Sequence, residues 1–400
     1  VVSRHDKTLN IPQWVVQDTT KALGDLAQLR RERFEGTVIA LTGSSGKTSV
    51  KEAISMILSQ ENNVHITSGN LNNHFGVPLT LLAMDSLAEI AVIEMGASAV
   101  GEIDYLCSIA KPDVALVNNA QTAHIEGFGS LEAIALAKAE IYQSLRVDGT
   151  AVLNLDQPWI AQWLDIIGNR NCISFSLIDP SANLFAKNIT DTGDGYFSFV
   201  LCIMPKQGEP SEESAVRLNN PGVHSISNAL AAAACAFAVG ASLAEIIRGL
   251  ENTLLIPGRL QRKVLSRKSV VIDDSYNANP ESFKAAIDVL SMSSSYRILV
   301  MGDMGELGEQ TEELHREVGG YAKKLQIDAL YSVGANSAIA SKEFMGQHFP
   351  TQRSLIDSLK VKIIELEASH ENITILVKGS RSSSMEHIVQ ALISGEKSSC

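Results

Sequence analysis

The chain has 400 residues, enough for roughly two or three domains with sizeable hydrophobic cores. Its 33 lysines and arginines against 45 aspartates and glutamates give a formal net charge of −12, which argues against nucleic acid or an anionic membrane as a partner. Five scattered cysteines without a C-x-x-C pair argue against a disulfide scaffold, and no apolar run reaches the roughly 20 residues of a membrane span, so we expect a cytoplasmic protein.

Short β-branched runs alternate with helical stretches from residue 37 onward, whereas residues 1–35 fit neither of the α/β units that follow. The strand segments predicted for the first unit are residues 37–41, 88–96, 112–120 and 149–156. Apolar strands joined by helical crossovers indicate a mostly parallel sheet with helices on both faces. The alternating pattern of residues 172–204, around a Gly-Asp-Gly turn, predicts a β appendage, and an alanine-rich helix is expected at residues 228–243.

The strand–helix rhythm starts again after Pro257-Gly258, a dipeptide typical of a hinge. Further strand segments are predicted at residues 269–276, 296–304, 328–334 and 373–380. This pattern indicates a second, Rossmann-like α/β domain. We therefore place a central P-loop domain with a mostly parallel sheet at residues 18–255 and a C-terminal α/β domain at residues 256–400.

Residues 42–49, with the sequence TGSSGKTS, form a glycine-rich turn between the first strand and a helix. Gly43 and Gly46 allow backbone N–H groups to converge on phosphate oxygens. Lys47 can reach the terminal phosphates, and Thr48 can offer its hydroxyl to Mg²⁺. The long form of this motif has a glycine where the chain has Leu41, so the residues alone leave open a shorter nucleotide site or an ordinary tight turn.

Ligands of an open parallel sheet bind at the carboxyl ends of its strands, where two polar residues are expected. Glu94 is either a Mg²⁺ ligand or a solvated loop carboxylate. His124 is either a metal ligand or a structural histidine. Lys138 shares a helix face with Ile134 and Ile141, so its amine either reaches water along the protein surface or points into a site.

Other polar residues are expected near the same cleft. Asn228 opens the alanine-rich helix and either contacts a base edge or caps the helix. Arg259, at the hinge, either stabilises a transferring phosphoryl group or is a surface charge. Residues 273–282 and 378–381 follow strands of the second domain and either contact a ligand that faces the first domain or act as helix caps.

These segments together resemble the Mur ligase family, ATP-dependent enzymes that build the peptide of the bacterial cell wall. The family's phosphate loop has the short form T-G-x-x-G-K-[TS], which TGSSGKTS matches without a glycine at position 41. Further matching segments are GNLNNHFGVPLTLL, VIEMGAS, HIEGFGSLEAIALAKAEI, HSISNALAAA, IPGR, DDSYNANP and KGSRSS. The resemblance covers essentially the whole chain and implies an ATP-dependent ligase that forms a peptide bond.

The resemblance also implies a particular stage of this synthesis. TGSSGKTS, DDSYNANP and VKGSR are similar to the stage that joins D-alanyl-D-alanine to UDP-N-acetylmuramoyl-tripeptide through an acyl phosphate. The stage that adds the diamino acid carries a D-N-P-R motif, which this sequence lacks, and the related folylpolyglutamate synthase usually has G-K-G-S in place of G-K-T. The alternative from another class is a P-loop regulator that uses ATP as a switch and has no ligase activity.

Roles for individual residues follow from the resemblance. Those implied in ATP binding are Gly43, Ser44, Ser45, Gly46, Lys47, Thr48, Ser49, Asn228, Arg259, Asp274 and Tyr276. Those implied in holding two Mg²⁺ ions are Thr48, Glu94, His124 and Lys138, the last as a carbamylated lysine. Catalysis is assigned to Lys47, Lys138, His124 and Arg259. Substrate contacts are assigned to Asn70, Asn72, Asn73, Asn277, Asn279, Lys378, Ser380 and Arg381.

The start of the sequence departs from the family pattern. Members begin with a small domain that binds the UDP of the sugar nucleotide, and residues 10–34 look like the segment that joins this domain to the central one. We therefore expect residues 1–17 to be a remnant of the UDP-binding domain and its linker, with most of that domain absent. Either the sequence is incomplete or the protein lacks a UDP anchor of its own. We also expect a monomer.

Overall fold

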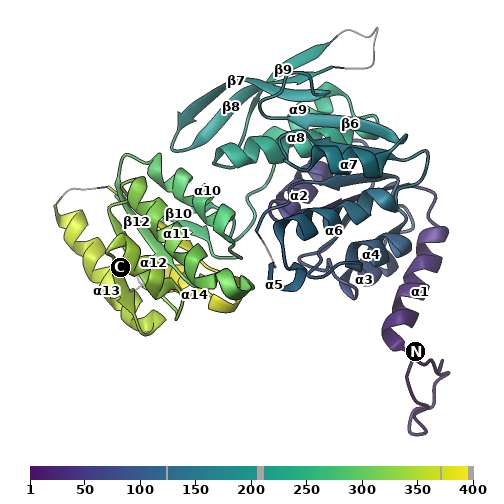
Figure 1. The fold of residues 1–400 in the computed structure, drawn as a ribbon, viewed down its shortest axis with the longest axis horizontal. Coiled ribbons are helices and arrows are strands. Elements are labelled where there is room, and N and C mark those ends of the chain that lie inside the picture. The colour runs from purple at the N-terminus through teal and green to yellow at the C-terminus, as the bar shows by residue number, and fades with distance from the viewer. Residues whose placement is uncertain (123–124, 205–210, 370–371, 395–400) are drawn as a thin grey trace.

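The computed structural model describes residues 1–122, 125–204, 211–369 and 372–394, which fold into two lobes that lie side by side (Figure 1). The first lobe is built on a nine-stranded sheet and the second on a six-stranded sheet. Two mostly parallel sheets covered by helices confirm the predicted α/β fold class. The predicted domain boundary at residues 255 and 256 lies between α9 (Leu243–Glu251) and β10 (Gln261–Val264), and it stays a prediction.

The sheet of the first lobe has the order β2-β3-β1-β4-β5-β6-β7-β8-β9. Its strands are β1 (Thr37–Thr42), β2 (Val64–Ile66), β3 (Ile90–Glu94), β4 (Val114–Val117), β5 (Thr150–Asn154), β6 (Asn171–Ser176), β7 (Leu184–Gly193), β8 (Tyr196–Ile203) and β9 (Glu212–Arg217). The pairs from β2 to β7 are parallel, and β7, β8 and β9 pair antiparallel. Because β1 lies between β3 and β4, the glycine-rich turn leaves the sheet from an interior strand with a parallel neighbour on each side.

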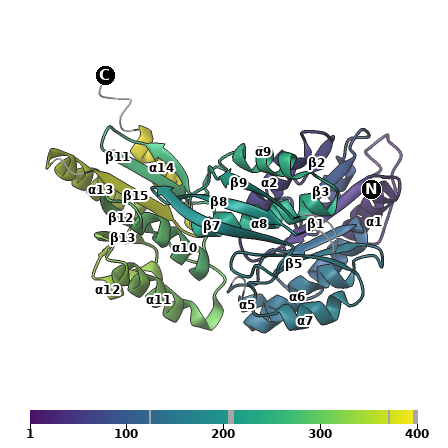
Figure 2. The same ribbon diagram turned by 90° about the horizontal axis from the view of Figure 1, so that it is seen from above.

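Helices cover both faces of this sheet (Figure 2). They are α1 (Thr19–Glu32), α2 (Lys47–Leu58), α3 (Gly76–Leu82), α4 (Glu102–Ala110), α5 (Ile125–Phe128), α6 (Leu131–Gln143), α7 (Ile160–Ile167), α8 (Val223–Ala238) and α9. Successive side chains of a strand point to opposite faces, so Val38 and Ala40 of β1 join the core beneath α3, α4, α6 and α7. Ile39 and Leu41 join the core beneath α2, α8 and α9. The buried β1 therefore fixes the direction in which its turn points.

The second lobe has the strand order β10-β11-β15-β12-β13-β14, in which only the β10–β11 pair of the described strands is antiparallel. Its strands after β10 are β11 (Ser269–Asp274), β12 (Tyr296–Met301), β13 (Ala329–Val333), β14 (Gln347–Phe349) and β15 (Ile373–Lys378). Its helices are α10 (Pro280–Ser291), α11 (Thr311–Lys324), α12 (Ser337–Phe344), α13 (Gln352–Ala368) and α14 (Glu386–Ser394). One apolar core lies beneath α10, α11 and α12 and another beneath α13 and α14, as expected for a Rossmann-like layer order.

Two sequence-based expectations need correction. The β appendage is not a separate unit, because β6 pairs with β5 and the antiparallel strands continue the same sheet, with β9 as an additional strand. The alanine-rich helix begins at Val223, so Asn228 lies in its second turn and the alternative that Asn228 caps this helix is wrong. Gly222 occupies the capping position instead.

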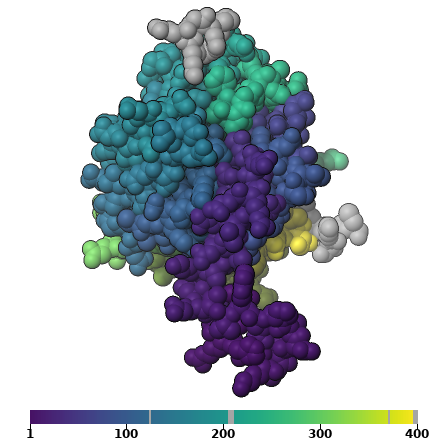
Figure 3. Space-filling model, turned by 90° about the vertical axis from the view of Figure 1, so that its right-hand side faces the viewer, coloured from purple at the N-terminus to yellow at the C-terminus, as the bar shows by residue number. Residues whose placement is uncertain are grey.

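Residues 1–17 extend from the body of the first lobe (Figure 3) and carry one isolated bridge, between Val2 and Val15. The following helix α1 packs against α3 and α4, and its buried Arg31 donates to the Ala110 carbonyl at 2.8 Å and pairs with Asp113 at 3.0 Å. Helix α1 is thus part of the first lobe. Across the described ranges, no helix combines the length and apolar character needed to span a bilayer.

Candidate active site

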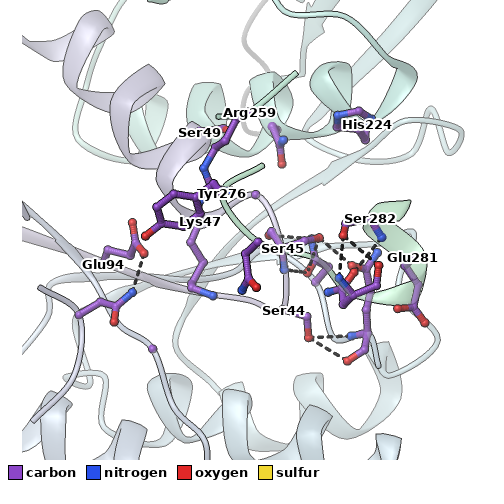
Figure 4. Close-up of a pocket in the computed structure, with 18 of the residues that line it drawn as sticks. Ser44, Ser45, Lys47, Ser49, Glu94, His224, Arg259, Tyr276, Glu281 and Ser282 are labelled. Carbon is purple, nitrogen blue, oxygen red and sulfur yellow. Dashed lines mark hydrogen bonds between the residues drawn. The ribbon is translucent and has the colours of Figure 1, made fainter. Parts of the chain in front are cut away.

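A cleft of about 1120 Å³ lies where the carboxyl ends of the parallel strands of both lobes meet (Figure 4). From the first lobe it is lined by the glycine-rich turn, the loop after β2, and Glu94 at the end of β3. From the second lobe it is lined by the loop after β11 and by Lys378 and Arg381 around the end of β15. This placement follows the rule that ligands of open α/β sheets bind at strand carboxyl ends.

The glycine-rich turn connects β1 to α2 and places Gly46 at the helix N-cap with φ 77°. A Cβ atom at Gly46 would lie 2.4 Å from Asn228 Oδ1, so both the backbone and the available space require glycine. Lys47 opens the helix and donates from Nζ to the Gly43 carbonyl at 2.7 Å. The first N–H groups of α2 have no partner within the helix, so the turn presents donors and a cation where a phosphate would bind.

Asn118 and Asn119, which follow β4, hold this turn and were not identified from the sequence. Asn119 accepts from the backbone N–H groups of Ser44 and Ser45, at 3.1 Å and 2.9 Å. Asn118 Nδ2 donates to the Ser45 carbonyl and to Asn228 Oδ1, both at 3.0 Å. The polar Asn-Asn pair directly after an apolar strand was the available signal, because that strand ends at the same sheet edge as β1.

Glu94 is buried, with 2% of its surface exposed, and is not a solvated loop carboxylate. Its Oε1 accepts from Asn72 Nδ2 at 2.8 Å, while Oε2 is buried and has no hydrogen-bond partner among the described residues. Burial lowers the pKa of the nearby Lys47, Glu94 raises it, and Arg259 lowers it again. The carboxylate and the lysine therefore share one electrostatic environment beneath the turn.

Lys138 lies on the buried face of α6, with 2% of its surface exposed, so the alternative in which its amine reaches water is wrong. Its Nζ lies 6.0 Å from the centre of the Phe128 ring, and no carboxylate of the described residues forms an ion pair with it. Burial, reinforced by the charge of Lys47, lowers the pKa of Lys138 to about 7. Lys138 is not among the residues that line the cleft, and His124 lies outside the described residues.

Arg259 connects the two lobes and is partly buried, not a surface charge. Its Nη2 donates to Thr48 Oγ1 at 3.1 Å, and its guanidinium stacks on the Tyr276 ring at 4.5 Å from the ring centre. Tyr276 in turn donates its backbone N–H to the Gly258 carbonyl at 3.1 Å. The hinge is thus connected to the glycine-rich turn on one side and to the second lobe on the other.

Asp274 and Lys378 form a buried ion pair at 2.5 Å in the wall of the second lobe. Asp274 Oδ1 also accepts from the Leu260 N–H at 3.1 Å, and Lys378 donates to the Asn277 carbonyl at 2.9 Å. Arg381 is exposed and pairs with Glu386 at 3.0 Å. This arrangement leaves Arg381 as the accessible cation of the wall.

The remaining predicted substrate residues divide by their contacts. Asn279 caps α10 in a capping box with Ser282 but also lines the cleft. Asn73 accepts from the Phe75 and Gly76 N–H groups at the start of α3. Ser380 bonds to neighbouring serine hydroxyls and does not line the cleft. Asn70 and Asn277 line it, as do Ser44, Ser45 and Ser49.

His224 and Glu281 also line the cleft. Glu281 lies within residues 273–282, for which a ligand contact was one of two expectations, whereas His224 was assigned no role of its own. Burial lowers the pKa of His224, while Asp274 raises it and Lys378 lowers it. Glu281 Oε2 is buried without a hydrogen-bond partner among the described residues. His224 lies in the first turn of α8 and Glu281 in the first turn of α10. The meeting of the two lobes brings both residues to the cleft.

Comparison with known proteins gives two consecutive family matches. Residues 41–236 match the Mur ligase middle domain, and residues 258–381 match the family described as Mur ligase, glutamate ligase domain. The UDP-N-acetylmuramoyl-tripeptide–D-alanyl-D-alanine ligase of Escherichia coli K12 is 46% identical over 385 residues, which are 96% of this chain and 83% of that protein.

Solved structures give the same family. A crystal structure of MurF from Acinetobacter baumannii has a TM-score of 0.90 at 37% identity, over 98% of this chain and 84% of the other. MurF ligase from Thermotoga maritima, solved in complex with ADP, has a TM-score of 0.84 at 26% identity, over 99% and 88%. The family predicted from the sequence is confirmed: this chain belongs to the Mur ligase family of ATP-dependent enzymes that form amide bonds.

Proposed function

We propose that this chain joins D-alanyl-D-alanine to UDP-N-acetylmuramoyl-tripeptide at the expense of ATP, forming the pentapeptide precursor of peptidoglycan. The observation that carries the proposal is the single cleft that gathers a phosphate-binding turn from one lobe and the Asp274–Lys378 wall and Arg381 from the other. The names of the E. coli and A. baumannii relatives, which align with nearly all of this chain, support this pair of substrates.

The reaction has two steps. The terminal carboxylate of the tripeptide attacks the γ-phosphorus of ATP, which forms an acyl phosphate and releases ADP. The amine of D-alanyl-D-alanine then attacks the acyl carbon, phosphate leaves with the C–O bond electrons, and the amine loses a proton. Such phosphoryl transfer depends mainly on positioning and on neutralising the phosphate charge. Lys47 and Arg259 would supply the two protein cations nearest the turn.

Magnesium fits the residues beneath the turn. The buried Glu94 Oε2 has no partner in the described part of the chain, and the Thr48 hydroxyl lies at the start of α2, so oxygen ligands of the kind Mg²⁺ prefers are present. We assign these two residues to the metal, together with His124 and Lys138 as the resemblance implied. Bound Mg²⁺ would neutralise phosphate charge and orient the γ-phosphate.

We further propose that Lys138 is carbamylated. A carbamate forms when a neutral amine attacks CO₂ and loses a proton, and the buried Lys138, with a pKa of about 7, is substantially neutral at physiological pH. The product is an anion, which would replace the repulsion between Lys138 and Lys47 by an attraction. The new carboxylate would orient a second Mg²⁺.

We assign the rest of ATP to the residues around the turn. Asn228 contacts adenine in this proposal, which requires it to exchange its bond with Asn118 for one with the base. Tyr276 and Asp274 are assigned to the ribose or phosphate side. Both Asp274 oxygens are already engaged, so we expect Tyr276 to make the closer contact.

We expect the polar loops around the cleft to bind the muropeptide and the dipeptide. We assign Asn70, Asn73, Asn277, Asn279, Lys378, Ser380 and Arg381 to the two peptide substrates. The exposed Arg381 is suited to a substrate carboxylate, because a guanidinium can donate two parallel hydrogen bonds to it. Lys378, buried in its ion pair, is suited to holding the wall in shape.

Phosphate release tests the proposal. Purified protein with Mg²⁺ and ATP is assayed alone, with either UDP-N-acetylmuramoyl-tripeptide or D-alanyl-D-alanine, and with both. We expect rapid turnover only when both are present. ATP hydrolysis at the same rate without the amine would contradict ligase function and favour a nucleotide switch. Turnover with a folate and glutamate in place of both peptides would favour the folylpolyglutamate synthase reaction.

A further inference from the structure

Asn72 lies in the loop between β2 and α3, and its side chain contacts a buried carboxylate of the cleft. Asn72 Nδ2 donates to Glu94 Oε1 at 2.8 Å, the bond drawn as a dashed line beside Glu94 in Figure 4. No other residue in the described part of the chain donates a hydrogen bond to the Glu94 carboxylate. The second oxygen, Oε2, is buried and has no hydrogen-bond partner there. The two carboxylate oxygens therefore have different environments.

The amide of Asn72 packs against Gly96. The Gly96 N–H donates to the Asn72 backbone carbonyl at 2.8 Å, which fixes the loop against the end of β3. A Cβ atom at residue 96 would lie 2.9 Å from Asn72 Oδ1 and 3.3 Å from Nδ2, so the whole amide lies close to this glycine. Only the N–H₂ group of an amide can donate to a carboxylate, so Nδ2 is the atom that faces Glu94.

The backbone of Glu94 is fixed as well. Its N–H donates to Thr67 Oγ1 at 2.9 Å, and the Thr67 carbonyl accepts from the buried Lys51 at 2.6 Å. A buried carboxylate oxygen without a partner is costly unless a cation compensates it. One carboxylate oxygen is held by a hydrogen bond and the other has no hydrogen-bond partner. This arrangement is expected where a neighbouring residue orients a side chain that binds a metal.

We propose that Asn72 is a positioning residue for a divalent cation at Glu94: it holds Oε1 so that Oε2 is the oxygen presented to the metal. This role replaces the expectation that Asn72 contacts the peptide substrate, and it rests on the proposed function in so far as the cleft binds ATP with Mg²⁺. Loss of such a neighbour typically weakens metal binding by about 10- to 100-fold.

The test measures the binding of a fluorescent, non-hydrolysable ATP analogue in excess EDTA and in excess Mg²⁺. The ratio of the two affinities is the gain that the metal confers. We expect Asn72→Ala to reduce this gain by about tenfold and to leave the affinity in EDTA unchanged, which also shows that the variant is folded. Asn62→Ala is the matched control, because Asn62 is partly buried and donates to the Leu58 carbonyl at 3.1 Å outside the cleft.

A double-mutant cycle with Glu94→Gln tests whether Asn72 acts through Glu94. In the Glu94→Gln background, Asn72→Ala should change the gain by less than about twofold, because the group that it orients is already altered. Equal losses in EDTA and Mg²⁺ would reduce Asn72 to a structural role and overturn the proposal. An unchanged gain with a raised KM for the muropeptide would overturn it in favour of a substrate contact. The binding measurement needs no peptide substrate. Its result can therefore be interpreted even if the ligase assay shows no activity.

Discussion

Lys47 and Lys138 lie within electrostatic reach of each other, and both have a lowered pKa. Burial is the first cause in both cases, and the charge of Lys47 adds to the effect at Lys138. Two buried like charges are unfavourable unless anions join them. Glu94 is one such anion, and ATP phosphates and a carbamate would be others. Substitution of each lysine therefore tests a different part of the proposed site.

Replacement of Lys47 by alanine removes the cation at the start of α2. We expect kcat to fall by about 10³-fold, because the charge that this lysine would place on the transferring phosphate is lost. Steady-state phosphate release measures the effect. Lys187→Ala is the control, since Lys187 pairs with Glu213 on an exposed strand far along the sheet. Turnover of Lys47→Ala within tenfold of the unaltered protein would contradict the phosphate-loop assignment.

The activity should depend on CO₂ in a pH-dependent way. The pKa of Lys138 is lowered to about 7, so the amine is an ammonium below that pH and becomes neutral as the pH rises through it. At constant dissolved CO₂, the rate gained over CO₂-depleted buffer should therefore increase between about pH 6 and pH 8. Lys138→Ala should remain folded and nearly inactive, and a small carboxylate that enters the space left by the lysine side chain should restore part of its rate. A CO₂-independent rate across this range would refute carbamylation.

Sequence patterns identified candidate site residues that come directly after a strand in the sequence. Glu94 was identified because it ends an apolar run, and the structure places it beside the glycine-rich turn. Asn118 and Asn119 carried the same signal and were missed, since asparagines after a strand are also common in ordinary turns. The bond between Asn72 and Glu94 joins a loop to the end of β3, 22 residues away, and no periodicity encodes such a contact.

At the scale of elements, the turn between β1 and α2 requires glycine at position 46. Gly46→Ala would introduce left-handed strain of about 1–2 kcal/mol and also a Cβ atom 2.4 Å from Asn228 Oδ1. We expect the variant to bind ATP at least tenfold more weakly, as measured by calorimetric titration. Gly240→Ala is the matched control: φ is 91° there, and nothing lies within 4 Å of the added Cβ. Equal ATP affinities of the two variants would show that the turn does not bind the nucleotide.

Element types were more predictable than their limits. The strands at residues 37–42 and 269–274 stand out because both faces are buried and each contains an apolar run, at residues 38–41 and 270–272. The start of α8 was misplaced by five residues, since Val223 to Ser227 lack the alanine pattern and Gly222 provides no side-chain cap. The continuity of β7–β9 with the parallel sheet depends on pairing between strands, which a single sequence does not display.

At the scale of the whole molecule, polar and apolar contacts join the lobes besides the chain itself. A Cβ atom at Gly195 would lie 3.4 Å from Met292 Sδ, so apolar side chains of the second lobe reach the first. Arg259 donates to Thr48, Arg262 pairs with Asp194 at 3.2 Å, and the Glu126 N–H donates to the Glu306 carbonyl at 3.5 Å. We expect contacts of this kind to permit the lobes to move about the Pro257-Gly258 hinge. In the proposed mechanism the residues assigned to the reaction come from both lobes, so we expect the lobes to approach during catalysis.

Small-angle scattering tests this movement. We expect the radius of gyration to fall when a non-hydrolysable ATP analogue and both peptide substrates are added together, and to change less with the nucleotide alone. The physical reason is that the nucleotide is held mainly by the first lobe, while the peptides contact both. An unchanged radius at saturating concentrations of all three would argue against closure as part of the cycle.

In the proposed reaction, the carboxylate of the muropeptide is activated by phosphorylation before the amine attacks it. The most direct measurement uses UDP-N-acetylmuramoyl-tripeptide with ¹⁸O in its terminal carboxylate, followed by mass spectrometry of the products. We expect UDP-N-acetylmuramoyl-pentapeptide in equal amount to phosphate, with one ¹⁸O atom transferred to each phosphate. Phosphate without ¹⁸O, released in the absence of any pentapeptide, would contradict it.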